Sequence, residues 1–147
     1  MTSLFLDTSY FIAIVSRRDD NHRAAEGIHN TIVSINNIEF YTFWLVLTEL
    51  LGFFGGKGKS LRVSASRAVR SLLDEKIVKV ISTEPDDLDT AFNLYSGRID
   101  KPYSLVDCHI MISIWKLGLS GVISFDGDFA KEGIHTIRSG QDALLFS

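Results

Sequence analysis

Short apolar runs alternate along the chain with longer segments in which apolar residues recur every three or four positions. The short runs predict buried strands at residues 3–7, 39–43, 77–82, 121–125 and 134–137. The longer segments predict helices at about residues 8–16, 22–35, 44–54, 60–75, 85–97 and 104–118, and Thr83 is expected to cap the fifth of these. Because strands separated by helices form βαβ units, we expect an α/β fold with a mainly parallel sheet covered on both faces.

Length and composition restrict the class of protein. With 147 residues, 46% of them hydrophobic and 22% charged, the chain is expected to form one globular domain over residues 1–147. A net charge of −3 gives no overall attraction to nucleic acid or to an anionic membrane, so any basic surface must be local. The single cysteine excludes an internal disulfide. The N-terminal segment lacks the features of a signal peptide, so we expect a cytoplasmic protein.

Carboxylates stand in or beside apolar runs, where a folding core tolerates them least. The five residues are Asp7, Glu49, Asp107, Asp126 and Asp128. An ionised carboxylate is costly to bury unless a positive partner offsets its charge. These residues therefore either have separate local roles or converge and share a cation.

Local roles explain most of them one at a time. Asp7 is placed to cap the helix that begins at Thr8, and Ser104-x-x-Asp107 resembles a capping box. The Asp126-Gly127 pair is typical of a turn, after which Asp128 can cap a short helical turn. Glu49 lies in the middle of an apolar helix, away from any cap, so its local explanation is the weakest.

The expected fold is consistent with convergence of four of these residues. In open parallel sheets, sites form at the carboxyl ends of the strands. Asp7 and Asp126 end two predicted strands, while Glu49 and Asp107 lie one to two turns into helices that begin near the same edge. Two carboxylates about 4 Å apart repel each other by roughly 4 kcal/mol at an effective dielectric constant near 20. Such a cluster requires protonation or a hard cation such as Mg²⁺ or Mn²⁺, which can activate water against a phosphodiester.

The sequence resembles a known family, the PIN-domain nucleases, and within it the small VapC-type toxins of type II toxin–antitoxin systems. The matching stretches are Leu4–Ser9, Asp19–Ala25, Thr48–Leu50, Ser104–Cys108 and Ser124–Phe129. The order and separation of these stretches agree with the family over nearly the whole chain. The resemblance implies a three-layer α/β/α sandwich around a short parallel sheet, with an acidic metal site.

The resemblance also implies roles for individual residues. The expected catalytic residues are Asp7, Glu49, Asp107 and Asp126, of which Asp7, Asp107 and Asp126 are the expected ligands of Mg²⁺ or Mn²⁺. Hydroxyl groups of Thr8, Ser9, Ser104 and Ser124 are expected to support the carboxylates, and Asp128 is a further supporting candidate. Ser124 stands where the family often has threonine, a change that keeps the hydroxyl. The implied activity is metal-dependent hydrolysis of RNA.

The expected partners are an RNA substrate, an antitoxin protein that blocks the site, and a second copy of the chain in a homodimer. No acidic residue occurs between Leu50 and Leu73, so Lys57, Lys59 and Arg62 are candidate RNA contacts, although a solvated helix face explains them equally well. Two alternatives remain open for the whole protein. It is either a free-standing RNA-processing nuclease of the same fold, or a PIN-like interaction module with an inert site.

Overall fold

The computed structural model describes residues 1–147 and has a five-stranded sheet at its centre. All neighbouring strands are parallel, as expected. Across the sheet, the strands are β3 (Val78–Ile81), β2 (Ile38–Phe43), β1 (Thr2–Leu6), β4 (Gly121–Ile123) and β5 (Thr136–Ile137). The chain builds outward from β1 in one direction first and then returns to β4 on the other side. This reversal between β1 and β4 is the position at which sheets of this type open a crevice beyond their strand ends.

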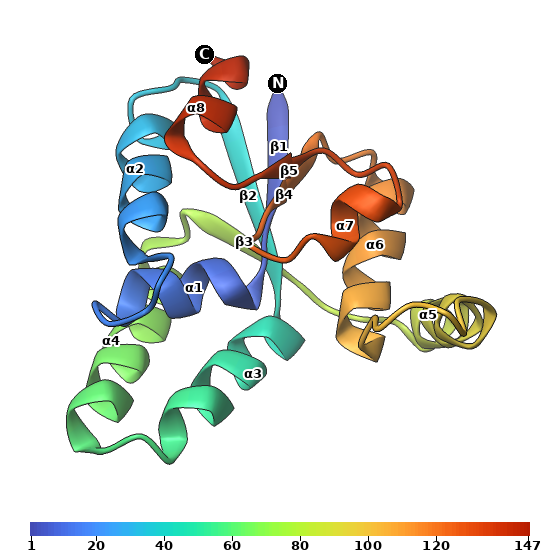
Figure 1. Cartoon of the computed structure of the whole chain (residues 1–147), viewed down its shortest axis with the longest axis horizontal. Helices are drawn as coiled ribbons and strands as arrows, with labels where there is room; N and C mark the ends of the chain where they lie inside the picture. Colours follow the sequence, from blue (N-terminus) through green and yellow to red (C-terminus); the bar gives the residue numbers. More distant parts are fainter.

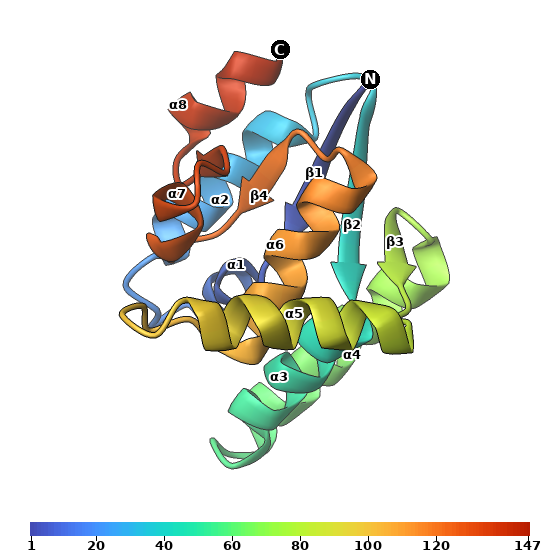
Figure 2. The ribbon, with the colours of Figure 1, turned by 90° about the vertical axis from the view of Figure 1, so that its right-hand side faces the viewer.

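Helices cover both faces of the sheet, so the expected three-layer α/β/α arrangement is confirmed. Their bounds are α1 (Thr8–Val15), α2 (His22–Ile32), α3 (Trp44–Gly55), α4 (Lys59–Glu75), α5 (Pro85–Gly97), α6 (Leu105–Leu117), α7 (Asp128–Lys131) and α8 (Gly140–Ala143), followed by a 3₁₀ turn, η1 (Leu144–Phe146). Figure 1 shows α1 and α2 on one side of the sheet and α5 and α6 on the other. In Figure 2, α5 crosses in front of α6, and α3 and α4 project together beyond the ends of the strands. None of these helices combines the length and the apolar character needed to span a membrane.

The central strand is buried on both faces, which explains why its sequence is apolar without alternation. Leu4, Phe5 and Leu6 are all buried, and the Phe5 ring contacts the Phe43 ring of β2 edge-on, with centroids 4.9 Å apart. Apolar burial on this scale fixes the register of β1 against its neighbours, because a shift by one residue would reverse every side chain. The carboxyl end of β1, and Asp7 after it, are therefore held at a defined point of the sheet edge.

Some element boundaries differ from the predictions. The second helix ends at Ile32 rather than near Ile35, and the fourth strand ends at Ile123 rather than Phe125. At the residue after the strand, the Ser124 hydroxyl donates a hydrogen bond to Asp7. The expected cap Thr83 is also wrong, since Glu84 is the N-cap of α5 in a capping box with Asp87. The short helices α7 and α8 are too brief to leave a periodic pattern.

Gly121 provides a test of how tightly β4 and β5 are paired. A Cβ added at Gly121 would lie 2.5 Å from the backbone oxygen of His135, which already accepts a hydrogen bond from the Val122 N–H. We therefore expect Gly121→Ala to lower the free energy of unfolding by about 1–3 kcal/mol. Urea unfolding followed by circular dichroism measures this change.

The matched control is Gly52→Ala in α3, where an added Cβ meets no atom within 4 Å. Alanine is more favourable than glycine in the exposed interior of a helix, so this variant should be as stable as the parent or up to about 1 kcal/mol more stable. Equal unfolding midpoints for both variants would contradict the close approach of β5 to Gly121.

Candidate metal centre

Asp7 lies at the centre of a hydrogen-bonded junction between β1 and β4. Its N–H donates to the Ile123 carbonyl at 3.1 Å, so the backbone at this point joins the two strand ends. Its Oδ2 accepts hydrogen bonds from the hydroxyls of Ser124 at 2.7 Å and Ser9 at 2.9 Å. The same two hydroxyls accept the N–H groups of Asp126 and Phe125, each at 3.0 Å. Asp7 therefore fixes the start of the loop that carries Asp126.

The Asp7 carboxylate is buried, with 6% of its surface exposed. Burial raises the pKa of Asp7, because the charged form loses its hydration, and the hydrogen bonds from Ser124 and Ser9 oppose that rise. The position of Asp7 matches the N-cap of α1, but its side chain makes no capping bond to that helix. The backbone N–H groups of Thr8 and Ser9 nevertheless lower the pKa of Asp7 from the start of α1, so a local role at this helix end and a place at the junction coexist.

Asp107 is held in the first turn of α6. The Asp107 N–H donates to Ser104 Oγ at 3.0 Å, and the Ser104 N–H donates back to Asp107 Oδ2 at 2.9 Å. The predicted capping box is thus confirmed. Burial raises the pKa of Asp107 to about 6, and the nearby charges of Asp7 and Asp126 add to the rise, against the opposing hydrogen bonds from Ser104. Capping aligns this carboxylate with its neighbours without neutralising it.

Asp126 and Asp128 come from the loop after β4 and the first turn of α7. The Asp128 N–H donates to Asp126 Oδ1 at 2.9 Å, and the Lys131 ammonium donates to Asp128 Oδ1 at the same distance. Burial raises the pKa of Asp126, and the charge of Asp128 adds to this effect. The sequence analysis missed Lys131, although its i+3 spacing from Asp128 on a helical turn is the usual one for an ion pair.

Carboxylate oxygens of Asp107, Asp126 and Asp128 all lie within 4.8 Å of one another. Asp7 lies outside this trio but near enough for its charge to raise the pKa of Asp107. The only cation paired with the trio is Lys131, so negative charge remains uncompensated. An all-oxygen set of this kind fits a hard divalent cation, which would also offset the repulsion between the carboxylates.

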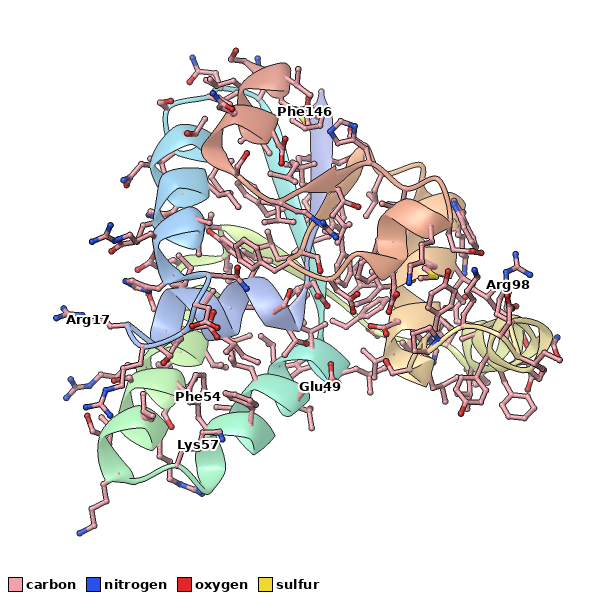
Figure 3. The ribbon with its side chains drawn as sticks, viewed as in Figure 1. Arg17, Glu49, Phe54, Lys57, Arg98 and Phe146 are labelled. Atoms are coloured by element: carbon pink, nitrogen blue, oxygen red, sulfur yellow. The ribbon has the colours of Figure 1, made fainter.

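Glu49 is exposed on α3, and its Oε1 accepts a hydrogen bond from the Thr8 hydroxyl at 2.8 Å. Thr8 follows Asp7, so this bond connects Glu49 to the junction from the outer side. Figure 3 shows Glu49 on α3 below the ends of the strands. The structure thus brings Glu49 to the rim of the acidic site, not among the carboxylates of the trio. Its catalytic role stays a prediction, as do the metal-binding roles of Asp7, Asp107 and Asp126.

The three candidate RNA contacts lie in the loop after α3 and in the first turn of α4. The Lys57 ammonium sits 4.5 Å above the Phe53 ring, Arg62 donates to the Gly55 carbonyl, and Lys59 is exposed. At 1.5 Å per residue, the six positions from Glu49 to Gly55, the last residue of α3, correspond to roughly 9 Å along the helix, and Lys57 follows in the loop. Lys57 also lines a hollow of about 570 Å³ together with Arg17 and Arg18, which the sequence analysis did not consider.

Comparisons with known proteins place this geometry in context. A model of the PIN domain family matches residues 4–133. The 23S rRNA-specific endonuclease VapC20 of Mycobacterium tuberculosis is 23% identical over 138 residues, which cover 92% of this chain and 98% of that protein. The match of the family model over most of the chain therefore supports the resemblance that the sequence motifs indicated.

Two solved structures share the fold. The crystal structure of Mycobacterium tuberculosis VapC20, described as a sarcin–ricin-loop-cleaving toxin, has a TM-score of 0.78 at 22% identity and covers 89% of this chain and 95% of its own. VapBC-1 from nontypeable Haemophilus influenzae has a TM-score of 0.65 at 14% identity and covers 92% and 96%. At these identities, the likeness establishes a common fold.

The raised pKa of Asp107 predicts how stability depends on pH in the metal-free protein. An aspartate in an unfolded chain has a pKa of about 3.9, whereas the pKa of Asp107 in the folded chain is about 6. The folded state binds the Asp107 proton more tightly than the unfolded state does. The stability that protonated Asp107 contributes is therefore fully present below about pH 4 and is lost as the pH rises through about 6. Asp107→Asn removes this titration.

Relative to the parent, Asp107→Asn should therefore gain about 1 kcal/mol in free energy of unfolding between about pH 4 and pH 8, a value reduced because the carboxylate keeps part of its solvent contact. Urea unfolding in the presence of a chelator measures this difference. Asp89→Asn on the exposed face of α5 is the control and should show no such trend. If the difference in free energy of unfolding between Asp107→Asn and the parent did not vary with pH, this result would contradict the raised pKa of Asp107.

Proposed function

The chain belongs to the PIN domain family, and on that premise we propose that it is an endoribonuclease that hydrolyses RNA with Mg²⁺ or Mn²⁺ bound at its acidic site. The observation that carries the proposal is the approach of the Asp107, Asp126 and Asp128 oxygens to within 4.8 Å of one another beside buried Asp7. Oxygen-only ligands favour these hard cations over softer metals. The alternative of an inert interaction module is less favoured, because without a cation the repulsion between the carboxylates would destabilise the protein with no compensating interaction.

In this proposal the carboxylates of Asp107, Asp126 and Asp128 are available to hold the cation, and Asp7 stays among the expected ligands. A bound divalent cation would lower the pKa of a coordinated water molecule and offset negative charge on the phosphate. Ser9 and Ser124 keep the Asp7 carboxylate oriented through their hydrogen bonds. Glu49, at the solvent-exposed rim, is placed to orient a water molecule or accept its proton, with its own oxygen fixed by Thr8.

We further propose that the protein acts as the toxin of a toxin–antitoxin pair. VapC20, whose name gives 23S rRNA as its target, matches this chain over 98% of its own length, and VapBC-1 shares the fold. An antitoxin protein and a second copy of the chain are the proposed partners. An apolar stripe on α5 supports a protein interface on this face of the molecule, because its side chains are exposed at helical spacing: Leu88, Phe92 and Tyr95.

The proposed RNA path leads from the acidic site along α3. The hollow lined by Arg17, Arg18 and Lys57 contains no acidic residue, and none of these cations forms an ion pair. Figure 3 shows Lys57 at the far end of α3 from the strands and Arg17 on the loop between α1 and α2. A chain with a net charge of −3 needs such local basic surface to attract RNA.

Asparagine substitutions test the proposed activity. Asp7→Asn and Asp107→Asn each retain an oxygen that can accept the existing hydrogen bonds but remove a negative charge from the site. We expect either variant to lose on the order of 100-fold or more in Mn²⁺-dependent cleavage of single-stranded RNA, since even outer-shell changes around metal sites cost 10–100-fold. Gel-based cleavage assays with and without a chelator measure this loss, and circular dichroism checks the fold.

Asp89→Asn removes an exposed carboxylate of α5 with the same change in net charge, so it should cleave RNA like the parent. Full activity in Asp7→Asn or Asp107→Asn would end the assignment of the acidic site. A parent protein that binds Mn²⁺ but cleaves no RNA would favour the inert interaction module.

A further inference from the structure

Arg138 follows β5 directly and lies at the same edge of the sheet as the carboxylates. In the parallel ladder, Ile137 pairs with Ile123, so the residues after the two strands leave the sheet side by side. The backbone of Arg138 is fixed, because its N–H donates to Asp142 Oδ2 at 2.9 Å at the start of α8. Its side chain is exposed. A rigid backbone thus presents a solvent-accessible guanidinium beside the acidic loop.

The guanidinium of Arg138 lies against Gly127, the residue between Asp126 and Asp128. A Cβ added at Gly127 would be 2.7 Å from Arg138 Nη2 and 3.8 Å from Cζ. The backbone angles of Gly127, φ −75° and ψ −7°, are open to any residue, so its conformation does not require glycine. What the missing side chain provides is space, and the guanidinium of Arg138 occupies that space.

Despite this position, the Arg138 guanidinium forms no ion pair with a carboxylate. Lys131, the other cation near the loop, is already paired with Asp128 at 2.9 Å. The Arg138 guanidinium is therefore a positive charge beside the loop of Asp126 and Asp128 that no carboxylate pairs with. An exposed guanidinium next to carboxylates that it does not neutralise is suited to an anion that arrives from solution.

We propose that Arg138 binds a phosphate group of the RNA strand at the acidic site, an inference that rests on the proposed ribonuclease function. The planar guanidinium presents paired N–H donors that match two oxygens of one phosphate, which a lysine ammonium does not. The strand must bring its negative charge up to a set of carboxylates, and Arg138 offsets that repulsion on the side of the loop. Gly127 keeps the guanidinium close enough to the loop to serve the phosphate at the reacting position.

Two substitutions distinguish the contribution of the guanidinium group from the contribution of its position. Arg138→Ala removes the group, while Gly127→Ala keeps it and pushes it away, because the added methyl would overlap Nη2. With a pool of short single-stranded RNA oligonucleotides and Mn²⁺, Arg138→Ala should lower kcat/KM by about 10- to 100-fold, the worth of a hydrogen bond to a charged group. Arg138→Lys should recover only part of this loss, because lysine lacks the paired donors.

Gly127→Ala should lower kcat/KM as well, and the double variant Gly127→Ala/Arg138→Ala should be no slower than Arg138→Ala alone, since the methyl acts through the arginine. Mn²⁺ affinity, measured by calorimetry without RNA, should be unchanged or tighter in Arg138→Ala, because a neighbouring positive charge is gone. Arg23→Ala, an exposed and unpaired arginine of α2, is the matched control and should behave like the parent.

Parent-like kcat/KM in Arg138→Ala would overturn the inference. So would a parallel loss of Mn²⁺ affinity, which would make Arg138 a support of the metal site, or additive effects in the double variant. If the parent itself cleaves no RNA with Mn²⁺, the proposed function fails together with this inference. If the parent cleaves and Arg138→Ala cleaves equally well, only the phosphate contact is excluded.

Discussion

Repulsion between carboxylates that the fold forces together at one edge of the sheet is the constraint on which the rest of this structure depends. Asp7 is buried at the end of the central strand β1, and its charge reaches Asp107 in the first turn of α6. Burial and these neighbouring charges raise the pKa values of Asp107 and Asp126. Hydrogen bonds from hydroxyl and backbone N–H groups nevertheless orient Asp7, Asp107 and Asp126, and Asp128 is paired with Lys131. The site is consequently preorganised, and the stability lost to repulsion is available to be regained when a cation binds.

The sequence predicted the parts of this site that depend on local pattern. Asp7 and Asp126 were found because apolar runs end at them, and the capping box of Ser104 and Asp107 has a recognisable spacing. That box shows that a local role and a place in the cluster are compatible in one residue. The convergence itself followed from a general property of parallel sheets, with no pairwise signal between the stretches.

The sequence could not predict contacts made across strands. The Ser124 hydroxyl donates a hydrogen bond to Asp7, a residue 117 positions away. Arg138 meets Gly127 only because β5 pairs with β4, and the two-residue strand β5 leaves too little pattern to predict that pairing. The α7 turn, which brings Lys131 to Asp128, is likewise too short for periodicity to reveal. Site residues that depend on side-chain packing between short elements are therefore the ones that sequence reasoning missed.

The most direct test of the central claim is anomalous diffraction from crystals soaked in Mn²⁺. The account predicts one or more anomalous peaks between Asp107 and Asp126, with carboxylate oxygens at about the 2.1 Å typical of small hard divalent cations. Crystals that contain Mn²⁺ elsewhere, but none among these carboxylates, would contradict the claim that they share a cation.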